Sequence, residues 1–123
     1  MNAKHYVSLE AAKKLKELGY NKEVYRVIDE ESDVFGNRRR RNQDLPECYW
    51  SCLTLLEAMD WLEERGIIIV VGWDSKTKKW FFLINRKEHL HVIYNSTFDG
   101  DEDDYTDRNE CMQKAIEKAF ELL

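Results

Sequence analysis

The 123-residue sequence predicts an α+β fold: a mainly antiparallel sheet of about four strands, with three helices packed mostly on one face. Two observations lead to this class. Apolar residues recur at helical spacing near both ends of the chain and once in its middle. Three strand-like runs, joined by short polar turns, lie between the second and third helical segments. We therefore expect one domain over residues 1–123, in the order helix, strand, loop, helix, three strands, helix.

The first helix and the first strand have clear local signals. Ser8 can cap the helix, apolar residues continue at helical spacing to Leu18, and Gly19 suits a left-handed stop. Glu23–Ile28 then alternates between two sets of side chains, a pattern that predicts a strand.

The middle of the chain predicts a long loop followed by a well-capped helix. Residues 29–46 have no periodicity and contain the only proline, and loops of this length in small domains are commonly functional or mobile. Residues 48–52 predict a short strand. Thr54-x-x-Glu57 then forms a capping box at the start of the second helix.

Three strands and a last helix complete the predicted order. Ile67–Trp73 is apolar on both faces, which is typical of a central strand. Lys79–Asn85 alternates, and His89–Asn95 has the half-solvated pattern that suits a sheet edge. A second irregular charged loop, about residues 96–106, precedes a final helix that Asp107 can cap.

Composition favours an intracellular protein. Hydrophobic residues make up 43% and charged residues 35%, and the formal net charge of −5 argues against a general nucleic-acid binder. Purely apolar runs such as Ile67–Val71 are too short to cross a bilayer, and the N-terminus does not resemble a signal peptide. We expect a cytoplasmic protein without membrane contact, in which Cys48, Cys52 and Cys111 are free thiols.

The segment Thr54–Glu63 carries a resemblance. Its sequence, Thr-Leu-Leu-Glu-Ala-Met-Asp-Trp-Leu-Glu, resembles one that recurs in small uncharacterised proteins of phage and gut-bacterial genomes. Those proteins continue with a strand, an aromatic hairpin and a closing helix similar to Ala115–Leu123. The resemblance covers most of the chain outside the two charged loops. It implies the fold and a phage or mobile-element origin, and it brings no activity and no site residues.

The main basic feature is a run of four arginines in the first charged loop. Guanidinium groups bind phosphate oxygens in pairs, and aromatic side chains can stack on bases. The candidate residues for a sequence-independent nucleic-acid contact are Arg38, Arg39, Arg40, Arg41, Tyr49 and Trp50, with Asn37, Asn42 and Gln43 adding hydrogen bonds. The alternative is a loop that is solvated, or that pairs with acidic surface on its own or another subunit.

The main acidic feature has the ligand spacing of an EF-hand calcium loop. Positions 1, 3, 5, 9 and 12 of that loop correspond to Asp99, Asp101, Asp103, Asp107 and Glu110, and Tyr105 can offer a carbonyl. Position 6 is Asp104 where the motif has glycine, and the preceding segment has a strand pattern where the motif has a helix. The alternative is an acidic helix entry that stabilises the N-terminal dipole.

Zinc binding and catalysis find less support in the sequence. Cys48-x-x-x-Cys52 and His89-x-His91 contain ligand types for zinc, but this histidine spacing fits none of the common structural fingers. No glycine-rich phosphate loop, dinucleotide fingerprint or nucleophile elbow occurs in the sequence. We therefore predict a binding role rather than an enzyme, with no cofactor and no catalytic residue.

Self-association is the last prediction. The predicted sheet is apolar on both faces, with helices enough to cover one, and its aromatic residues are Trp73, Trp80, Phe81, Phe82 and Tyr94. Either loops and the third helix cover the second face, or a homodimer forms through the sheet or its edge strand. The two charged loops, opposite in sign, can also pair, which predicts self-association that salt weakens and that neutralising Arg38–Arg41 abolishes. We predict an interaction module that binds a protein partner or itself.

Overall fold

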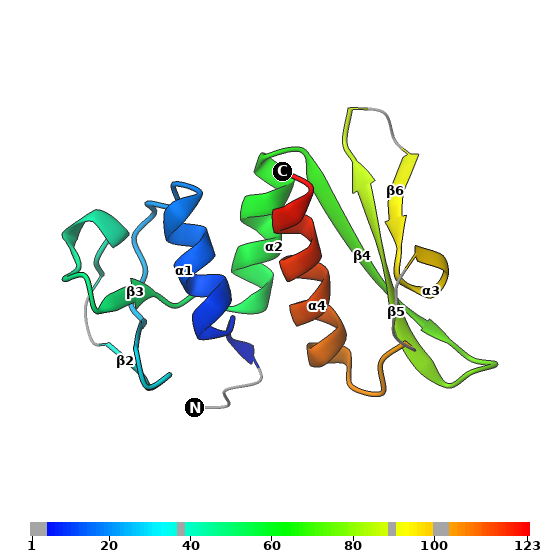
Figure 1. Cartoon of the computed structure of the whole chain (residues 1–123), viewed down its shortest axis with the longest axis horizontal. Coiled ribbons are helices and arrows are strands. Elements are labelled where there is room, and N and C mark those ends of the chain that lie inside the picture. The colour runs from blue at the N-terminus through cyan, green and yellow to red at the C-terminus, as the bar shows by residue number, and fades with distance from the viewer. Residues whose placement is uncertain (1–4, 37–38, 89–90, 100–103) are drawn as a thin grey trace. The chain divides into compact units, whose positions relative to one another are not determined.

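The computed structural model describes residues 5–36, 39–88, 91–99 and 104–123 (Figure 1). They belong to two units, Met1–Thr54 and Leu55–Leu123. Each unit combines helical segments with a three-stranded antiparallel sheet, which confirms the α+β class. The described strands thus form two small sheets, where the sequence predicts one sheet of about four strands. The single domain over residues 1–123 stays a prediction.

The first unit contains an α-helix, one turn of 3₁₀ helix and a small sheet. In chain order its elements are α1 (Leu9–Glu17), β1 (Val27–Asp29), β2 (Val34–Phe35), η2 (Asn42–Asp44) and β3 (Tyr49–Ser51). The strand order is β2-β1-β3, with both pairs antiparallel. Helix α1 is capped as expected: the Ser8 hydroxyl accepts a hydrogen bond from the N–H of Ala11 at 3.2 Å. Gly19, with φ of 94°, follows its end.

The second unit contains a longer sheet and its covering helices. In chain order its elements are α2 (Leu55–Glu64), β4 (Ile67–Asp74), β5 (Lys79–Arg86), β6 (His91–Asn95), α3 (Ser96–Asp99) and α4 (Arg108–Glu121). The strand order is β4-β5-β6, antiparallel throughout. Helices α2 and α4 both contact β4, and α4 also contacts β5. Figure 1 shows these two helices on the same side of the sheet.

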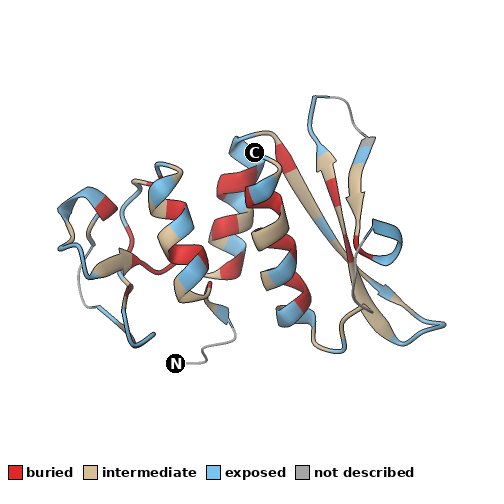
Figure 2. Cartoon of the chain, in the orientation of Figure 1, coloured by how far each residue is buried: buried red, intermediate tan, exposed pale blue. Residues whose placement is uncertain are grey.

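Alternation along the strands gives this sheet an inner face and an outer face. The inner face, beneath α4, carries the buried side chains of Ile67, Phe82 and Ile84. Tyr94 pairs with Ile84 and shares this face, because the ammonium group of Lys118 on α4 lies 4.8 Å from the centre of its ring. Figure 2 shows buried positions repeating along α2 and α4, whereas the β4–β5 turn is exposed.

The irregular segments contain more structure than the sequence predicts. The strand expected over Glu23–Ile28 starts later, as β1, and Val24 forms only an isolated bridge with Arg40. The loop expected over residues 29–46 contains β2 and η2, which are two and three residues long. The loop expected over residues 96–106 begins with α3. Elements this short have no periodicity that a sequence pattern can show.

The position of β4 corrects a further prediction. The two-sided apolar run at Ile67–Trp73 predicts a central strand, but β5 lies at the centre and β4 lies at an edge. The expectation that the last strand lies at an edge is confirmed by β6. An apolar sequence pattern cannot by itself distinguish a central strand from an apolar strand at the edge of a sheet.

Candidate functional site

The arginine segment is attached to the chain near Val24. The backbones of Arg40 and Val24 exchange two hydrogen bonds of 3.0 Å, N–H to carbonyl in both directions. The side chains on either side of Arg40 then approach Glu23: an Arg39 nitrogen lies 4.0 Å from its carboxylate, and an Arg41 nitrogen 3.9 Å. Arg38 lies outside the described residues. One acidic side chain of the same chain therefore partly offsets two of the candidate arginines.

An aromatic ring lies beneath one of these arginines. The Arg39 guanidinium is centred 5.2 Å from the ring of Tyr25, a cation–π distance, and the Tyr25 side chain is 50% exposed. Arg40 is half-buried, and its Nε has no hydrogen-bond partner among the described residues. Of the three candidate arginines that the structure describes, the exposed ones are therefore Arg39 and Arg41.

Tyr49 and Trp50 do not form a common stacking platform. They are neighbours on β3, so their side chains point to opposite faces of the sheet. The Tyr49 ring meets Phe35 edge-on at 5.5 Å, whereas the Lys13 ammonium group lies 5.0 Å from the Trp50 ring. The two predicted aromatic residues therefore cannot stack on neighbouring bases from one surface.

The amide side chains of this loop are used within the fold. Asn42 is 3% exposed; its amide group donates to the carbonyl of Tyr20 at 2.9 Å and accepts from the N–H of Ser51 at 2.8 Å. Gln43 forms an exposed reciprocal pair with Asn21, at 2.9 and 3.2 Å. Asn42 holds the loop against β3 and the end of α1, which makes it a structural residue.

The described residues of the predicted calcium loop have structural partners. The Asp99 carboxylate accepts from the N–H of Asn95 at 2.8 Å. Asp107 is the N-cap of α4, as predicted, and accepts from the N–H of Asn109 at 3.0 Å. Glu110 lies exposed in the first turn of α4. Asp101 and Asp103 lie outside the described residues, so calcium binding stays a prediction.

The backbone of Tyr105 is part of the sheet. It exchanges two hydrogen bonds with Trp80: Trp80 N–H to Tyr105 carbonyl at 2.6 Å, and Tyr105 N–H to Trp80 carbonyl at 2.9 Å. The carbonyl that the EF-hand spacing assigns to calcium therefore already accepts a hydrogen bond. Asp104 is also engaged, because the hydroxyl groups of Ser96 and Thr97 donate to its carboxylate at 3.2 and 2.8 Å.

A second acidic group, which the sequence analysis did not single out, lies after β1. Carboxylate oxygens of Asp29, Glu31 and Asp33 all lie within 4.8 Å of one another. Asp29 accepts hydrogen bonds from the N–H groups of Glu31 and Asp33, both at 2.9 Å, so its carboxylate stabilises a tight turn. The sequence signal that could have identified this group is the alternation Asp-x-Glu-x-Asp. The hydrogen bonds of Asp29 show that the three carboxylates lie close together because the chain turns here.

The three cysteines differ in burial, and the histidines of the possible zinc site cannot be placed beside them. Cys48 is exposed, whereas Cys52 and Cys111 are buried. His89 and the side chain of His91 lie outside the described structure. Burial, together with the nearby carboxylates of Asp104 and Glu110, raises the pKa of the Cys111 thiol from 9.0 to about 12. A thiol with so high a pKa is a poor nucleophile at neutral pH.

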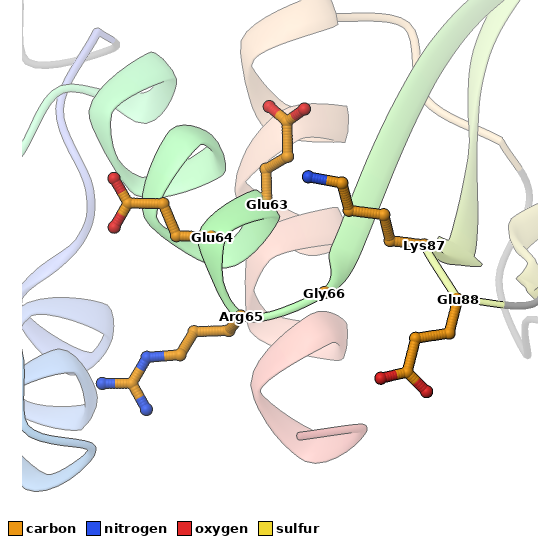
Figure 3. Close-up of a pocket in the computed structure, with 6 residues that line it drawn as sticks. All are labelled: Glu63, Glu64, Arg65, Gly66, Lys87 and Glu88. Atoms are coloured by element: carbon orange, nitrogen blue, oxygen red, sulfur yellow. The ribbon is translucent and has the colours of Figure 1, made fainter.

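One open depression lies where α2 turns into β4. It has a volume of about 310 Å³ and is lined by Glu63, Glu64, Arg65, Gly66, Lys87 and Glu88. Figure 3 shows the ammonium group of Lys87 turned toward Glu63, while Glu64 and Arg65 point away from them. The side chains diverge and do not converge on a common point. This depression lacks the apolar enclosure that small-molecule sites have.

The outer face of the β4-β5-β6 sheet carries a group of apolar side chains. These side chains, which alternate with the buried inner set, are Ile68, Val70, Phe81, Leu83 and Val92. The polar Asn85 lies on the same face opposite Ile68 and Val92, and the oppositely charged Asp74 and Lys79 lie at its end. Val70 is 42% exposed and Val92 47% exposed. The ring of Phe81 lies across Gly72, where an added Cβ would come within 2.5 Å of its Cζ atom. Glycine therefore lets an aromatic ring cover the neighbouring strand on this face.

Comparisons with protein-family models, with curated proteins and with solved structures find no match. The resemblance of Thr54–Glu63 to phage and gut-bacterial proteins therefore stays a prediction. No helix in the described part of the chain is long and apolar enough to span a membrane.

Proposed function

We propose that this protein is a cytoplasmic interaction module, binding rather than catalytic, that associates with a second copy of itself through the β4-β5-β6 sheet. The observation that supports this function is strand β4, which is apolar from Ile67 to Trp73, lies at an edge of the sheet and has exposed side chains at Val70 and Trp73. The outer face beside it carries further apolar, partly covered side chains: Ile68, Phe81, Leu83 and Val92. A surface of this kind commonly marks a protein–protein contact.

A second copy is a fitting partner because β4 carries no charge from Ile67 to Trp73 that would repel its counterpart. In a two-fold symmetric dimer the same patch meets itself, so each charged residue on it would have to find an opposite charge on the same patch. Residues Ile67–Trp73 of β4 need no such arrangement. Covering an exposed apolar surface contributes about 25 cal/mol per Å² to association.

The oligomeric mass tests this function. Sedimentation velocity over a wide concentration range should show a monomer–dimer equilibrium, and a strict monomer at the highest concentration would end the proposal. Salt separates two kinds of dimer. A contact through the sheet should persist in high salt, whereas one through the two charged loops should dissociate because salt screens exposed charges.

A phosphate contact is the second candidate function, and the Arg39–Tyr25 pair favours it. The ring is half exposed beneath the guanidinium, and Arg41 adds a second exposed cation. Fluorescence anisotropy with a labelled single-stranded oligonucleotide should show binding at low salt, with a log–log salt slope no steeper than about −4. Replacing Arg38–Arg41 by alanine should abolish it. Absence of binding by the wild type at low salt would remove this candidate.

A further inference from the structure

Strand β4 has the composition of a central strand but lies at the edge of its sheet. Its first seven residues, Ile67–Trp73, are apolar on both faces before the strand ends at Asp74, and β5 is its only described strand partner. Strands that are apolar on both faces are usually buried between neighbours, whereas only Ile67 of β4 is buried and Val70 and Trp73 are exposed. This mismatch leaves an apolar edge open to a further strand.

The hydrogen bonds of β5 show which groups of β4 face outward. The N–H of Phe82 donates to the Ser96 hydroxyl, and the backbone of Trp80 bonds to that of Tyr105. The backbone N–H and carbonyl groups of the even-numbered residues of β5 therefore point away from β4. The odd-numbered residues of β5 therefore bond to the even-numbered residues of β4. The carbonyl of Gly66, which accepts from the N–H of Lys87, fits the same alternation.

The outward backbone groups of β4 thus belong to Ile67, Ile69, Val71 and Trp73. No hydrogen bond joins them to another segment of the described chain. They offer four N–H groups and four carbonyl groups in an extended row, which is the template that another strand recognises.

The two edges of the sheet differ in their protection. Strand β6 has five residues, and its pairing with β5 shifts register between Ile84 and Asn85. Short strands and irregular pairing are the usual means of blocking edge-to-edge contact, as are lysine and proline. Strand β4 has regular pairing along all eight residues and contains neither lysine nor proline. It is the open edge of this sheet.

We propose that two copies of this chain pair through β4, antiparallel and centred on Val70, to form a continuous six-stranded sheet. A two-fold axis perpendicular to the sheet places the inner faces of both copies on the same side of the joined sheet. It also pairs odd-numbered residues of one β4 with odd-numbered residues of the other, and even-numbered residues with even-numbered ones. Centring on Val70 places the outward groups of Ile69 opposite those of Val71 in the second copy. Val70 then faces its own counterpart in a pair without direct backbone hydrogen bonds.

The strand matches itself in this register. The cross-strand pairs are Val70 with Val70, Ile69 with Val71, and Ile67 with Trp73, which are the β-branched and aromatic combinations that stabilise sheets. At each end, Asp74 of one copy comes opposite Gly66 of the other, which has no side chain to repel it. No like charges face each other along the strand. A second copy of this chain therefore satisfies both the open backbone groups and the side chains of β4.

Disulfide trapping tests the register, which rests on the proposed self-association. In a Cys48→Ser background the remaining native thiols, Cys52 and Cys111, are buried. Val70→Cys should then give a disulfide-linked dimer under mild oxidation, because non-hydrogen-bonded antiparallel pairs bring Cα atoms to about 4.5 Å, within disulfide range. Val92→Cys is the matched control: it is equally exposed on the same face but lies on β6. It should form several-fold less dimer.

The possible outcomes distinguish a failure of the proposed β4 register from a failure of the proposed self-association. If the wild type is dimeric and Val70→Cys traps no more dimer than Val92→Cys, the β4 contact is wrong while self-association stands. If the wild type is a strict monomer, both fail. A proline gives an independent readout: Val71→Pro removes one outward N–H and leaves the ladder to β5 intact. It should weaken dimerisation by about tenfold or more with an unchanged circular dichroism spectrum; an undiminished dimer with that spectrum would overturn the register.

Discussion

The buried amide of Asn42 permits a quantitative test of how the arginine-bearing loop is held. Asn42→Ala withdraws the donor to the Tyr20 carbonyl and the acceptor of the Ser51 N–H at a position that is 3% exposed. Losing a hydrogen bond to a buried polar group costs about 1–3 kcal/mol. Two such losses should lower the free energy of unfolding by about 2–4 kcal/mol, a large fraction of the stability of a small domain.

The adjacent Gln43 supplies the control. Gln43→Ala removes one exposed hydrogen bond, from the Asn21 amide to the Gln43 side-chain carbonyl, and keeps the one that the Gln43 backbone N–H donates to Asn21. Its cost should be less than about 1 kcal/mol. Urea titrations followed by circular dichroism measure both values. Equal losses in the two variants would refute the reasoning, because burial would then make no difference. Asn42→Asp should regain stability as the pH falls, since only a protonated carboxyl can donate to the Tyr20 carbonyl.

Three further changes test other parts of the second unit. Because burial raises the pKa of Cys111 from 9.0 to about 12, the unfolded thiol ionises first, and stability should fall between these pH values. This fall, up to about 1.4 kcal/mol per pH unit, should be absent from denaturant titrations of Cys111→Ala. Gly72→Ala should cost about 1 kcal/mol by displacing the ring of Phe81, and a double-mutant cycle with Phe81→Ala should remove that cost; additive losses would contradict the contact. Ser96→Ala should cost about 1–2 kcal/mol in the same titrations by withdrawing the acceptor of the Phe82 N–H, and an unchanged stability would argue against this role.

Local signals in the sequence predicted the parts of the fold that local interactions determine. Ser8 and Asp107 cap their helices because a side-chain oxygen meets an N–H two or three residues later. Gly19 and Gly66 follow the helices with φ of 94° and 88°, a conformation that favours glycine. These contacts span only a few residues, so the sequence around each one is sufficient to predict it.

The sequence could not predict features that depend on distant partners. Asn42 bonds to Tyr20 and Ser51, which are 22 and 9 residues away, and nothing near Asn42 distinguishes it from a solvated loop residue. The position of β4 at an edge depends on which strands pair, and periodicity reports only how a strand is buried. Both misjudged features lie where the tertiary arrangement, and not the local pattern, decides.

The unequal protection of the two sheet edges has a consequence for assembly size. Pairing through β4 uses the one long regular edge of each copy and leaves β6, short and irregularly paired, at both ends of the joined sheet. Next to β6, the Phe82 N–H of β5 already donates to the Ser96 hydroxyl, and the Trp80 backbone exchanges two hydrogen bonds with Tyr105. The assembly should therefore stop at two chains. The exposed edge of β4, which could otherwise promote aggregation, would be paired within a closed dimer that does not extend into fibres.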